Sequence, residues 1–522
     1  DQGLVWLETK TNNNLSIATA ATIAIESASK PNYKLKYNQK NLLVNVEITL
    51  DIKKNIEYNV YILGNIYTSK DSEYPIKDAK ENCLKNKDLG WMKLFKENKE
   101  KWNSIWSTDL IITGKNTAQI QKLIRSSLFN ILQSFSDDGE PIGLGPTGLS
   151  DGHLFGATTW EMEYCTLDPL LILQRNFAKQ LLNYRFQTKE IAEEYALWSG
   201  HKGLKWPLMS SISGKEMFST ENLEKLYGAG FISMAQMKYY FISRDKQWLE
   251  EKGFPIITGI SNYWASRSAW NDANKQIEFW DISSPLAKVP VNNCSFTSSI
   301  IQRNLTDAFE IEKFLGKYPT AKFHNMSNII KFPFDSTLQV YLPFDSFNNQ
   351  ETNNLFAAMM IFPIKKITNH NLIQNMIAHY EPQIESEYSS TSYAAFSIIN
   401  SGLGNKDMAW KLFKSYQLIW QDGKFQTWYK NPDNKEINYY LPAAGSFLQQ
   451  IIFGFIGMRF DLSGIYIKPS MPEDWDTIEM KNVELGSGRY DVLIQKGDIP
   501  KIKLVDGIAD VPIYNQFTFR LN

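Results

Sequence analysis

One glycine-rich segment has the spacing of a nucleotide-binding loop. Gly143, Gly145 and Gly148 satisfy the pattern Gly-x-Gly-x-x-Gly, which in dinucleotide-binding folds places backbone amides against a pyrophosphate. That chemistry needs a strand before the loop and a helix N-terminus directly after it. Here an acidic polar segment precedes the glycines, and Leu149-Ser-Asp-Gly-His153 follows them. We therefore interpret the segment as a loop and predict no nucleotide cofactor.

The histidines and cysteines show no metal-binding pattern. The 5 histidines have neither His-x-x-x-His nor His-Glu-x-x-His spacing. Cys83, Cys165 and Cys294 are too few and too scattered for a thiolate metal site or a disulfide scaffold. We predict no metal and no cofactor, and the sequence leaves the disulfide state of the three cysteines open.

Four asparagines stand in Asn-x-Ser/Thr acceptor sequences for glycosylation. They are Asn14, Asn293, Asn304 and Asn325. An asparagine-rich chain yields about this many acceptor sequences by chance. They favour a glycoprotein that is secreted or enters a secretory or lysosomal compartment.

Composition describes a large protein with a sizeable core. The chain has 522 residues, of which 43% are hydrophobic and 13% aromatic, so global disorder is excluded. A balance of 55 basic and 56 acidic residues argues against a nucleic-acid partner. Since no run of about 18 apolar residues occurs, we predict no membrane span. We expect the start at Asp1, without Met or a signal peptide, to lie within a domain.

Hydrophobic periodicity divides the chain into strands, then helices, then strands. Residues 42–50 and 58–64 alternate as strands do, and the charged stretch 77–101 has helical spacing. Beyond residue 115 the period becomes 3.6 and predicts about a dozen helices in antiparallel pairs. Helical hairpins with long loops suit a toroid whose loops form a site at one mouth. After Phe460 the strand pattern returns.

Short motifs in the helical region resemble those of glycoside hydrolase family 65. The motifs are Gly152-His-Leu-Phe155, Trp160-Glu-Met-Glu-Tyr164, Trp206-Pro207, Gly214-Lys-Glu216, Val291-Asn-Asn293, Thr427-Trp428 and Gly445-Ser-Phe-Leu-Gln449. The family includes acid trehalases, disaccharide phosphorylases, kojibiose hydrolases and a glucosidase acting on collagen glucosylgalactosyl-hydroxylysine. The resemblance in order and spacing extends from about residue 90 to about residue 470.

The resemblance implies a mainly α fold with flanking β structure. We expect residues 1–84 to be the C-terminal part of an N-terminal β-sandwich and residues 85–115 to be a helical linker. Residues 116–458 would form an (α/α)6 barrel, and residues 459–522 a small C-terminal β-sandwich. Most of the N-terminal sandwich would then precede residue 1. Family members are often dimers, so a homodimer is also implied.

The positions of the family's catalytic carboxylates are altered. An inverting glycosidase uses one carboxylic acid to protonate the leaving oxygen and one carboxylate to activate water. In the family the acid is the Glu of a Ser-Pro-Asp-Glu-Tyr-His segment, and the matching segment here, 284–293, has Ala287 and no carboxylate. The family's base lies in a Trp-Thr-Glu-Asn-like segment, where this chain has Lys430. An ammonium there opposes an oxocarbenium-like transition state. We interpret both catalytic positions as lost.

Sugar-contacting positions differ as well. The family's Phe-Trp-Asp is Phe155-Gly-Ala157 here, and its Trp-Glu-Ser is Leu208-Met-Ser210. The aromatic and polar residues that could remain from a sugar site, or that could simply be structural, are Trp160, Glu161, Trp206, Glu216, Asn293 and Trp428. Among the carboxylates near the altered segments, Asp281 is the candidate for a relocated catalytic group. The alternative is that these carboxylates are solvated or cap helices.

Three hypotheses follow from these residues. The first is a pseudoenzyme, a family 65 scaffold that serves a structural, partner-binding or glycan-binding role. The second is an active inverting α-glucoside hydrolase of the trehalose, kojibiose or glucosylgalactoside type with relocated carboxylates. The third is an unrelated (α/α) toroid enzyme. A phosphorylase is disfavoured, because no clear phosphate-anchoring cluster is evident near Leu441–Gly445. Expected partners are a glucoside or glycan ligand, a protein partner or a second copy of the chain.

Overall fold

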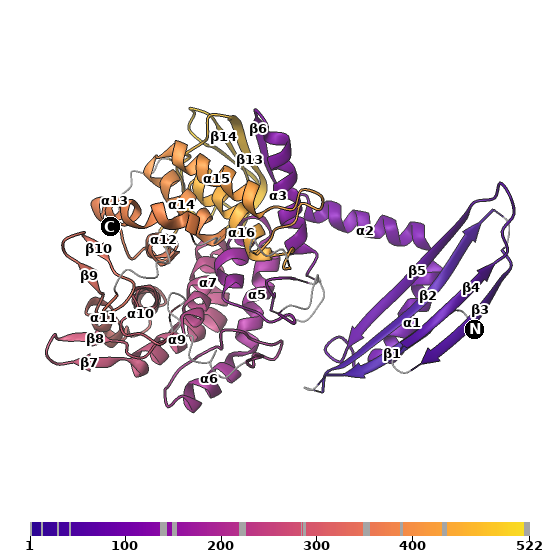
Figure 1. The fold of residues 1–522 in the computed structure, drawn as a ribbon, viewed down its shortest axis with the longest axis horizontal. Coiled ribbons are helices and arrows are strands. Elements are labelled where there is room, and N and C mark those ends of the chain that lie inside the picture. The colour runs from indigo at the N-terminus through magenta and orange to yellow at the C-terminus, as the bar shows by residue number, and fades with distance from the viewer. Residues whose placement is uncertain are drawn as a thin grey trace. The chain divides into compact units, whose positions relative to one another are not determined.

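A computed structural model describes residues 3–11, 14–28, 31–40, 43–135, 143–148, 154–218, 226–282, 284, 289–347, 355–386, 390–430 and 436–515. The chain divides into an N-terminal unit that ends at Ser107 and a larger unit that begins at Thr108 (Figure 1). In the part of the chain that the structure describes, no helix is long and apolar enough to cross a membrane.

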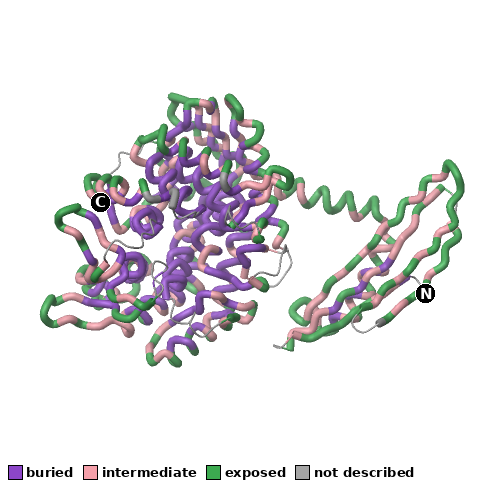
Figure 2. Tube along the Cα trace, in the orientation of Figure 1, coloured by how far each residue is buried: buried purple, intermediate pink, exposed green. Residues whose placement is uncertain are grey.

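The N-terminal unit is a pair of small antiparallel sheets with two helices. Strands β1 (Val5–Lys10), β2 (Ser16–Ser27) and β5 (Tyr58–Thr68) form one sheet in the order β1-β2-β5, and β3 (Tyr33–Lys40) pairs with β4 (Leu43–Leu50). Helices α1 (Pro75–Leu89) and α2 (Trp91–Ile105) follow. A small core joins Ala18 and Ala20 of β2 to Ala79 and Cys83 of α1. Figure 2 shows that most of this unit is exposed or only partly buried.

The larger unit contains a closed ring of inner helices. These are α4 (Leu167–Leu173), α7 (Tyr227–Ser243), α10 (Ser295–Phe314), α12 (Leu355–Ile361), α14 (Ser390–Leu403) and α16 (Leu441–Gln449). Each packs against the next, and α16 returns to α4. The outer helices are α3 (Thr117–Leu132), α5 (Arg175–Gln187), α6 (Lys189–Trp198), α9 (Phe254–Arg267), α11 (Ala321–Asn328), α13 (His370–Tyr380) and α15 (Lys406–Trp420). This is the (α/α)6 barrel that the motifs predict.

Burial explains which helices are inside. Every residue of α7 except Lys238 is buried, and α14 is almost as fully enclosed. An outer helix such as α5 buries one side only. Small residues allow the closest approaches: a Cβ added to Gly445 of α16 would lie 2.3 Å from the carbonyl oxygen of Cys165. Buried residues are accordingly concentrated in the helical unit (Figure 2).

Alternation of inner and outer helices gives the barrel two different ends. Since outer and inner helices alternate along the chain, the inner helices run in the same direction. The connections that precede the inner helices are long, as with residues 268–294 before α10, and those that follow are short, as with residues 404–405 after α14. We call the end with the N-termini of the inner helices the mouth, and the opposite end the base.

A strand that precedes the barrel completes the C-terminal sheet. Strands β13 (Trp475–Leu485), β14 (Gly488–Gln495) and β15 (Lys501–Gly507) are joined by β6 (Asp109–Gly114) in the antiparallel order β15-β14-β13-β6. A second small sheet contains β11 (Met458–Phe460), β12 (Ile465–Ile467) and β16 (Ile513–Tyr514). Residues 109–114 are therefore a strand, and the helical structure expected up to residue 115 ends at Ile105. The alternating Leu110 and Ile112, both buried, explain this difference.

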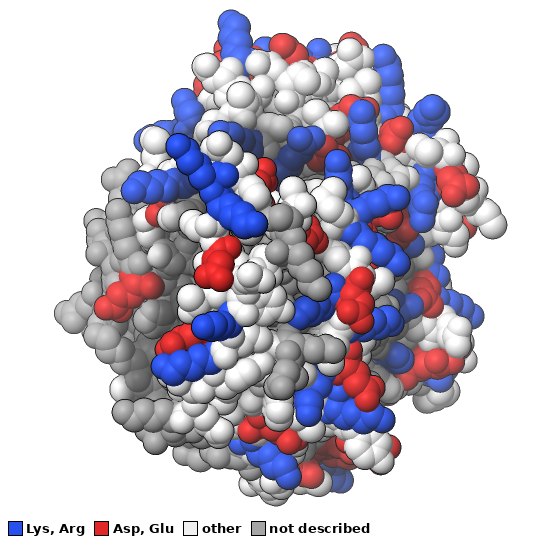
Figure 3. Space-filling view, turned by 90° about the vertical axis from the view of Figure 1, so that its right-hand side faces the viewer, with Lys and Arg blue, Asp and Glu red and all other residues white. Residues whose placement is uncertain are grey.

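Charged side chains of both signs are interspersed on the surface. The face shown in Figure 3 has no large area of one sign, in keeping with the formal net charge of −1. This face does not provide the continuous basic track that binds nucleic-acid phosphates.

A buried ion pair fixes the turn that leads into α4. Nε of Arg185 lies 2.6 Å and its Nη2 3.2 Å from the two carboxylate oxygens of Glu163, and Nη1 donates to Oγ of Ser210. The side chains of Arg185 and Glu163 are 2% and 1% exposed. Burial raises the pKa of Glu163, and the charge of Arg185 opposes that rise. Glu163 belongs to the π-helical turn η1 (Met162–Thr166), so α5 holds this turn in place.

Removing one member of this pair should unfold the larger unit more readily. We expect Glu163→Gln to lower its stability by about 3–5 kcal/mol, because Arg185 would remain buried without a counter-charge. Glu250→Gln is the matched control: its pair with Lys246 is exposed on both sides, so the loss should be at most about 1 kcal/mol. Urea and thermal unfolding followed by circular dichroism measure the difference. Equal unfolding midpoints for the two variants would show that the buried ion pair does not contribute substantially to stability.

Candidate functional site

Aromatic side chains gather at the mouth of the barrel. The Trp160 ring, directly before η1, is stacked on Tyr164 with centroids 5.6 Å apart. Tyr227, the first residue of α7, meets Trp160 edge-on at 5.8 Å and Phe296 of α10 at 5.7 Å. Trp160 is partly exposed, whereas Tyr227 is buried. One indole face is thus supported by a packed aromatic cluster.

Glu161 lies beside this cluster with half of its carboxylate unsatisfied. The hydroxyl of Tyr440, which precedes α16, donates to Oε1 of Glu161 at 3.3 Å. Oε2 is buried and has no hydrogen-bond partner among the described residues. A buried acceptor without a donor is costly, so this oxygen is suited to a donor from a ligand.

The neighbouring phenols remain protonated at neutral pH. Burial, together with the negative charge of Glu161, raises the pKa of Tyr440 well above its ordinary value. The same two causes, with burial the larger, raise the pKa of Tyr227. Both groups can therefore donate hydrogen bonds in the mouth but cannot act there as phenolate bases.

Lys430 approaches the same tyrosine. Its Nζ lies 5.9 Å from the centroid of the Tyr440 ring, and its backbone N–H donates to the carbonyl of Ile437. The side chain is exposed. The structure therefore brings Trp160, Glu161, Tyr227, Lys430 and Tyr440 to one end of the barrel, and we call these five residues the mouth cluster.

The segment that should carry the family's acid is anchored at both ends. Ile282 and Val291 exchange backbone hydrogen bonds, and Oδ1 of Asn293 accepts from the amide of Phe279. Asp281 belongs to this loop; it has a positive φ of 50° and an exposed side chain. Ala287 lies outside the described residues.

A network of ion pairs and hydrogen bonds holds Asn293, which anchors this loop. Nζ of Lys331 lies 3.0 Å from Asp345 and 3.3 Å from Glu278, and Nδ2 of Asn293 donates to Asp345 at 2.7 Å. Burial disfavours the charged form of Glu278, but hydrogen bonds from Trp280, Asn271 and Lys331 outweigh it and lower its pKa. Asn293 therefore holds the loop in place, and the prediction that it contacts sugar is corrected.

Three other predicted sugar contacts are structural. Trp206 and Trp428 are only 2% and 1% exposed, and their indole N–H groups donate to Thr188 and Ser127. Neither ring can stack on a ligand in this fold. The carboxylate of Glu216 accepts from three backbone amides, those of Met209, Met217 and Phe218, and thereby organises its own loop.

Two of the predicted glycosylation sites are buried. Asn293 is fully enclosed, and so is Asn304, whose amide accepts from Trp264 and donates to the carbonyl of Gly230. Neither side chain can carry a glycan, so these two predictions are wrong. Asn14 and Asn325 are exposed and remain predictions.

The cysteines are buried free thiols in this fold. Cys83, Cys165 and Cys294 form no disulfide, and burial raises the pKa of Cys83 and of Cys165. Within the described ranges, no group of three or more His, Cys, Asp and Glu side chains could hold a metal ion.

Tyr227 and Tyr440 were not among the candidate site residues identified from the sequence. They are more than two hundred positions apart, so no local spacing connects them. Tyr227 begins α7 and Tyr440 directly precedes α16, a shared position that only the folded structure reveals.

Comparisons with known proteins agree with this geometry. Residues 1–105 match the family model "Glycosyl hydrolase family 65, N-terminal domain", and residues 125–359 match "Glycosyl hydrolase family 65 central catalytic domain". The chain is 27% identical to a kojibiose hydrolase of Flavobacterium johnsoniae, over 83% of this chain and 64% of that protein. It is 23% identical to a protein-glucosylgalactosylhydroxylysine glucosidase of Dictyostelium discoideum, over 88% of this chain and 66% of that protein.

The chain thus spans slightly less than two thirds of these relatives. A solved structure from the human microbiome that carries the name of a kojibiose phosphorylase superposes with a TM-score of 0.78. It is 16% identical and covers 98% of this chain and 72% of that one. The fold likeness extends over both units, and the two matching family models are of the same family. The chain belongs to glycoside hydrolase family 65.

Proposed function

We propose that the mouth cluster binds an α-glucoside and that the chain does not perform the inverting hydrolysis of its family. The protein would then serve as a glycan-binding or structural pseudoenzyme. Family membership supports a glycoside ligand. The observation that carries the second half of the proposal is Lys430, whose ammonium occupies the mouth beside Tyr440 where the family's base is expected.

The mouth cluster offers the two kinds of contact that hold a sugar. The partly exposed face of Trp160 can pack against the apolar face of a pyranose ring. Oε2 of Glu161 can accept from a sugar hydroxyl, and the Tyr440 phenol can reorient to donate. An apolar platform with a few convergent polar groups is typical of a small-ligand site. Relatives named for kojibiose make this disaccharide the first ligand to test.

The described carboxylates around the mouth are poorly suited to replace the lost pair. Glu163 is neutralised by Arg185, and Glu216 is engaged by backbone amides. Glu161 already accepts from Tyr440. An inverting enzyme needs two carboxyl groups about 6.5–9.5 Å apart on opposite sides of the bond, one acid and one base. With a cation at the base position, a developing positive charge on the sugar is disfavoured.

A specific observation keeps an active hydrolase as the second candidate. Asp281 lies on the anchored loop that replaces the family's acid segment, and its carboxylate is exposed. In this alternative Asp281 would supply the acid or base from a relocated position, and the substrates would be kojibiose, trehalose or a glucosylgalactoside.

Hydrolysis should be undetectable in the purified chain. We expect glucose release from kojibiose, trehalose, maltose and nigerose to fall at least about 10⁴-fold below that of an active kojibiose hydrolase. The reason is that losing even one acid–base partner typically costs about 10²–10⁴-fold. A coupled glucose assay, with NMR to identify the anomer, measures the rate. Release of β-glucose that disappears in Asp281→Asn but persists in Asp272→Asn, an exposed aspartate that pairs with Lys275, would establish the second candidate.

Glucoside binding should depend on the mouth cluster. We expect isothermal titration to show kojibiose binding that Trp160→Ala and Glu161→Gln each weaken about tenfold, a loss of about 1.4 kcal/mol. Trp270→Ala is the control, since this 52% exposed indole lies on the hairpin of β7 (Ala269–Asn271) and β8 (Gln276–Glu278). Glu161→Gln preserves the side-chain shape, so circular dichroism should show an unchanged fold. Failure of every tested glucoside to bind the folded wild type would refute glucoside recognition.

A further inference from the structure

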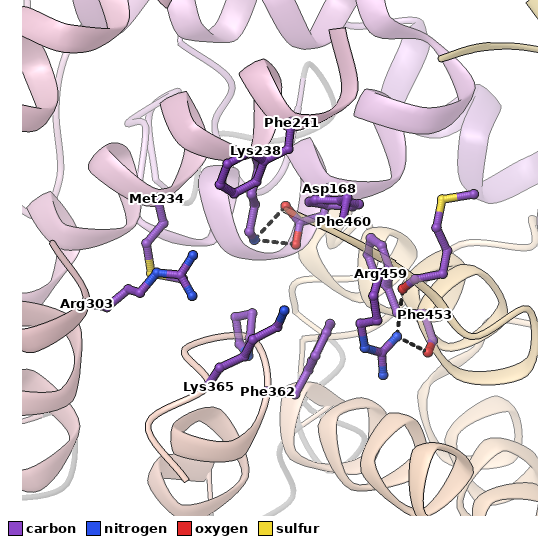
Figure 4. Close-up of a pocket in the computed structure, with 12 residues that line it drawn as sticks. Asp168, Met234, Lys238, Phe241, Arg303, Phe362, Lys365, Phe453, Arg459 and Phe460 are labelled. Atoms are coloured by element: carbon purple, nitrogen blue, oxygen red, sulfur yellow. Dashed lines mark hydrogen bonds and ion pairs between the residues drawn. The ribbon is translucent and has the colours of Figure 1, made fainter. Parts of the chain in front are cut away.

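A cavity extends from the barrel interior to the segments at its base (Figure 4). Its volume is about 470 Å³, which includes space open to solvent. The lining comes from the barrel interior and from the segments that follow α12 and η5 (Gln450–Phe455). We call it the basal cavity; its lining residues with charged side chains are Asp168, Lys238, Arg303, Lys365 and Arg459.

Two of its four cations have counter-charges. Nζ of Lys238 lies 2.8 and 2.6 Å from the two carboxylate oxygens of Asp168. Nε of Arg303 lies 2.8 Å from both carboxylate oxygens of Asp307, which is one helical turn further along α10. These pairs account for Lys238 and Arg303, and the other two lining cations have no ion-pair partner among the described residues.

The remaining cations are Lys365 and Arg459. Nη1 of Arg459 donates to the backbone carbonyls of Phe453 and Met458, which carry no formal charge. Lys365 makes no hydrogen bond or ion pair with any described residue. The residue is accessible to solvent, but its ammonium group at the cavity is closely surrounded by protein. Figure 4 shows Arg303, Lys365 and Arg459 around the same space.

The surroundings make these charges unfavourable to one another. Burial and the charges of Arg303 and Arg459 lower the pKa of Lys365 to about 8, and the charges of Asp461 and Asp307 offset only part of this fall. Burial lowers the pKa of Arg459 to about 10. The walls are largely apolar and weaken the screening by water, so a cation without a counter-charge is costly there. An anion in the cavity would relieve this repulsion.

A second cavity, which shares Arg459 with the basal cavity, extends the basic region. It is lined by Lys406 and Lys468 as well as Arg459, and no acidic side chain is among its lining residues in the described chain. The hydroxyls of Ser401 and Ser470 also line it, and both are buried without a hydrogen-bond partner among the described residues. Cations and hydroxyl donors around one guanidinium are the groups that recognise phosphate oxygens.

We propose that the basal cavity binds a phosphate group, as inorganic phosphate or as the phosphate monoester of a sugar. A dianion matches Lys365 and Arg459, the two lining cations that have no ion-pair partner among the described residues. The aromatic rings of Phe362 and Phe460 can pack against the carbon skeleton of a monoester. Because the base lies at the C-terminal ends of the inner helices, this site is separate from the mouth cluster, and a ligand there would be structural or regulatory.

Capping of the inner helices explains only part of this arrangement. Cations near the C-terminal end of a helix are favoured by its dipole, and Arg459 makes such contacts with the end of η5. Lys365 makes no such contact with a described residue, so capping does not account for its position.

Isothermal titration of the full chain with sodium phosphate, at constant ionic strength set by NaCl, tests the site. We expect one saturable site that Lys365→Met weakens about tenfold or more. The control is Lys366→Met: this adjacent lysine lies over the ring of Phe332, outside the basal cavity, and its loss should change binding less than twofold. Both variants remove one positive charge, so their comparison separates the site from the general field of the protein.

Parallel titrations with ribose 5-phosphate and ribose identify the source of the phosphate. Tighter binding of the monoester than of inorganic phosphate, with none of ribose, assigns a sugar phosphate; the reverse order assigns the free ion. Absence of saturable binding for both phosphates overturns the proposal. Equal weakening by Lys365→Met and Lys366→Met also overturns it. So does loss of phosphate binding in Trp160→Ala, which would place the ion at the mouth instead.

Discussion

The geometry of the mouth depends on the buried pair of Arg185 and Glu163. This pair ties α5 to η1, and η1 is where the chain turns from the long loop into the ring of inner helices. The carbonyls of Tyr164 and Cys165 in the same turn accept from Nε2 of Gln449 in α16, which approaches closely through Gly445. Two helices therefore hold the turn from opposite sides. Trp160 and Glu161 immediately precede it, so their positions follow from an interaction that contains neither of them.

The directions of the inner helices give each end of the barrel its electrostatic character. N-terminal helix ends carry partial positive charge and C-terminal ends partial negative charge. At the mouth, Tyr227 begins α7 and Tyr440 directly precedes α16, so the N-termini of both helices lie near Glu161. At the base, the ends of α12 and η5 lie near Lys365 and Arg459. The fold can thus retain an incompletely paired anion at one end and incompletely paired cations at the other.

Much of the architecture could be predicted from the sequence, because periodicity reports secondary structure and motif order reports family. The number of helices and the return to strands after Phe460 follow from these patterns. How deeply a given side chain is buried does not follow from these patterns. Trp206 and Trp428 belong to motifs that resemble a sugar site, yet hydrogen bonds to Thr188 and Ser127 hold both indoles in the core. The local sequence around a tryptophan does not distinguish an indole buried in the core from one that stacks on a sugar.

Contacts between segments that are far apart in the chain could not be predicted from the sequence either. Residues 109–114 were expected within a helical linker, but they alternate and find their partner in β13, so only tertiary structure reveals the strand. The acceptor pair of Tyr440 and Glu161 likewise joins segments 279 positions apart. Asn304 shows the opposite case: its acceptor sequence is purely local, whereas its buried amide bonds two other helices and excludes modification.

The pairing of β6 with β13 also has a consequence for the order in which the protein is synthesised and folds. Ile112 pairs with Ile478, 366 positions later, so the whole ring of helices is made between the two strands. At roughly 5–20 residues per second, a ribosome needs about 20–70 seconds to supply the partner. Until then β6 is a strand edge with no neighbour, a known starting point for association with other chains. The sheet beside the helical ring is therefore completed only after the ring has been synthesised, and a chain interrupted before β13 would leave β6 unpaired.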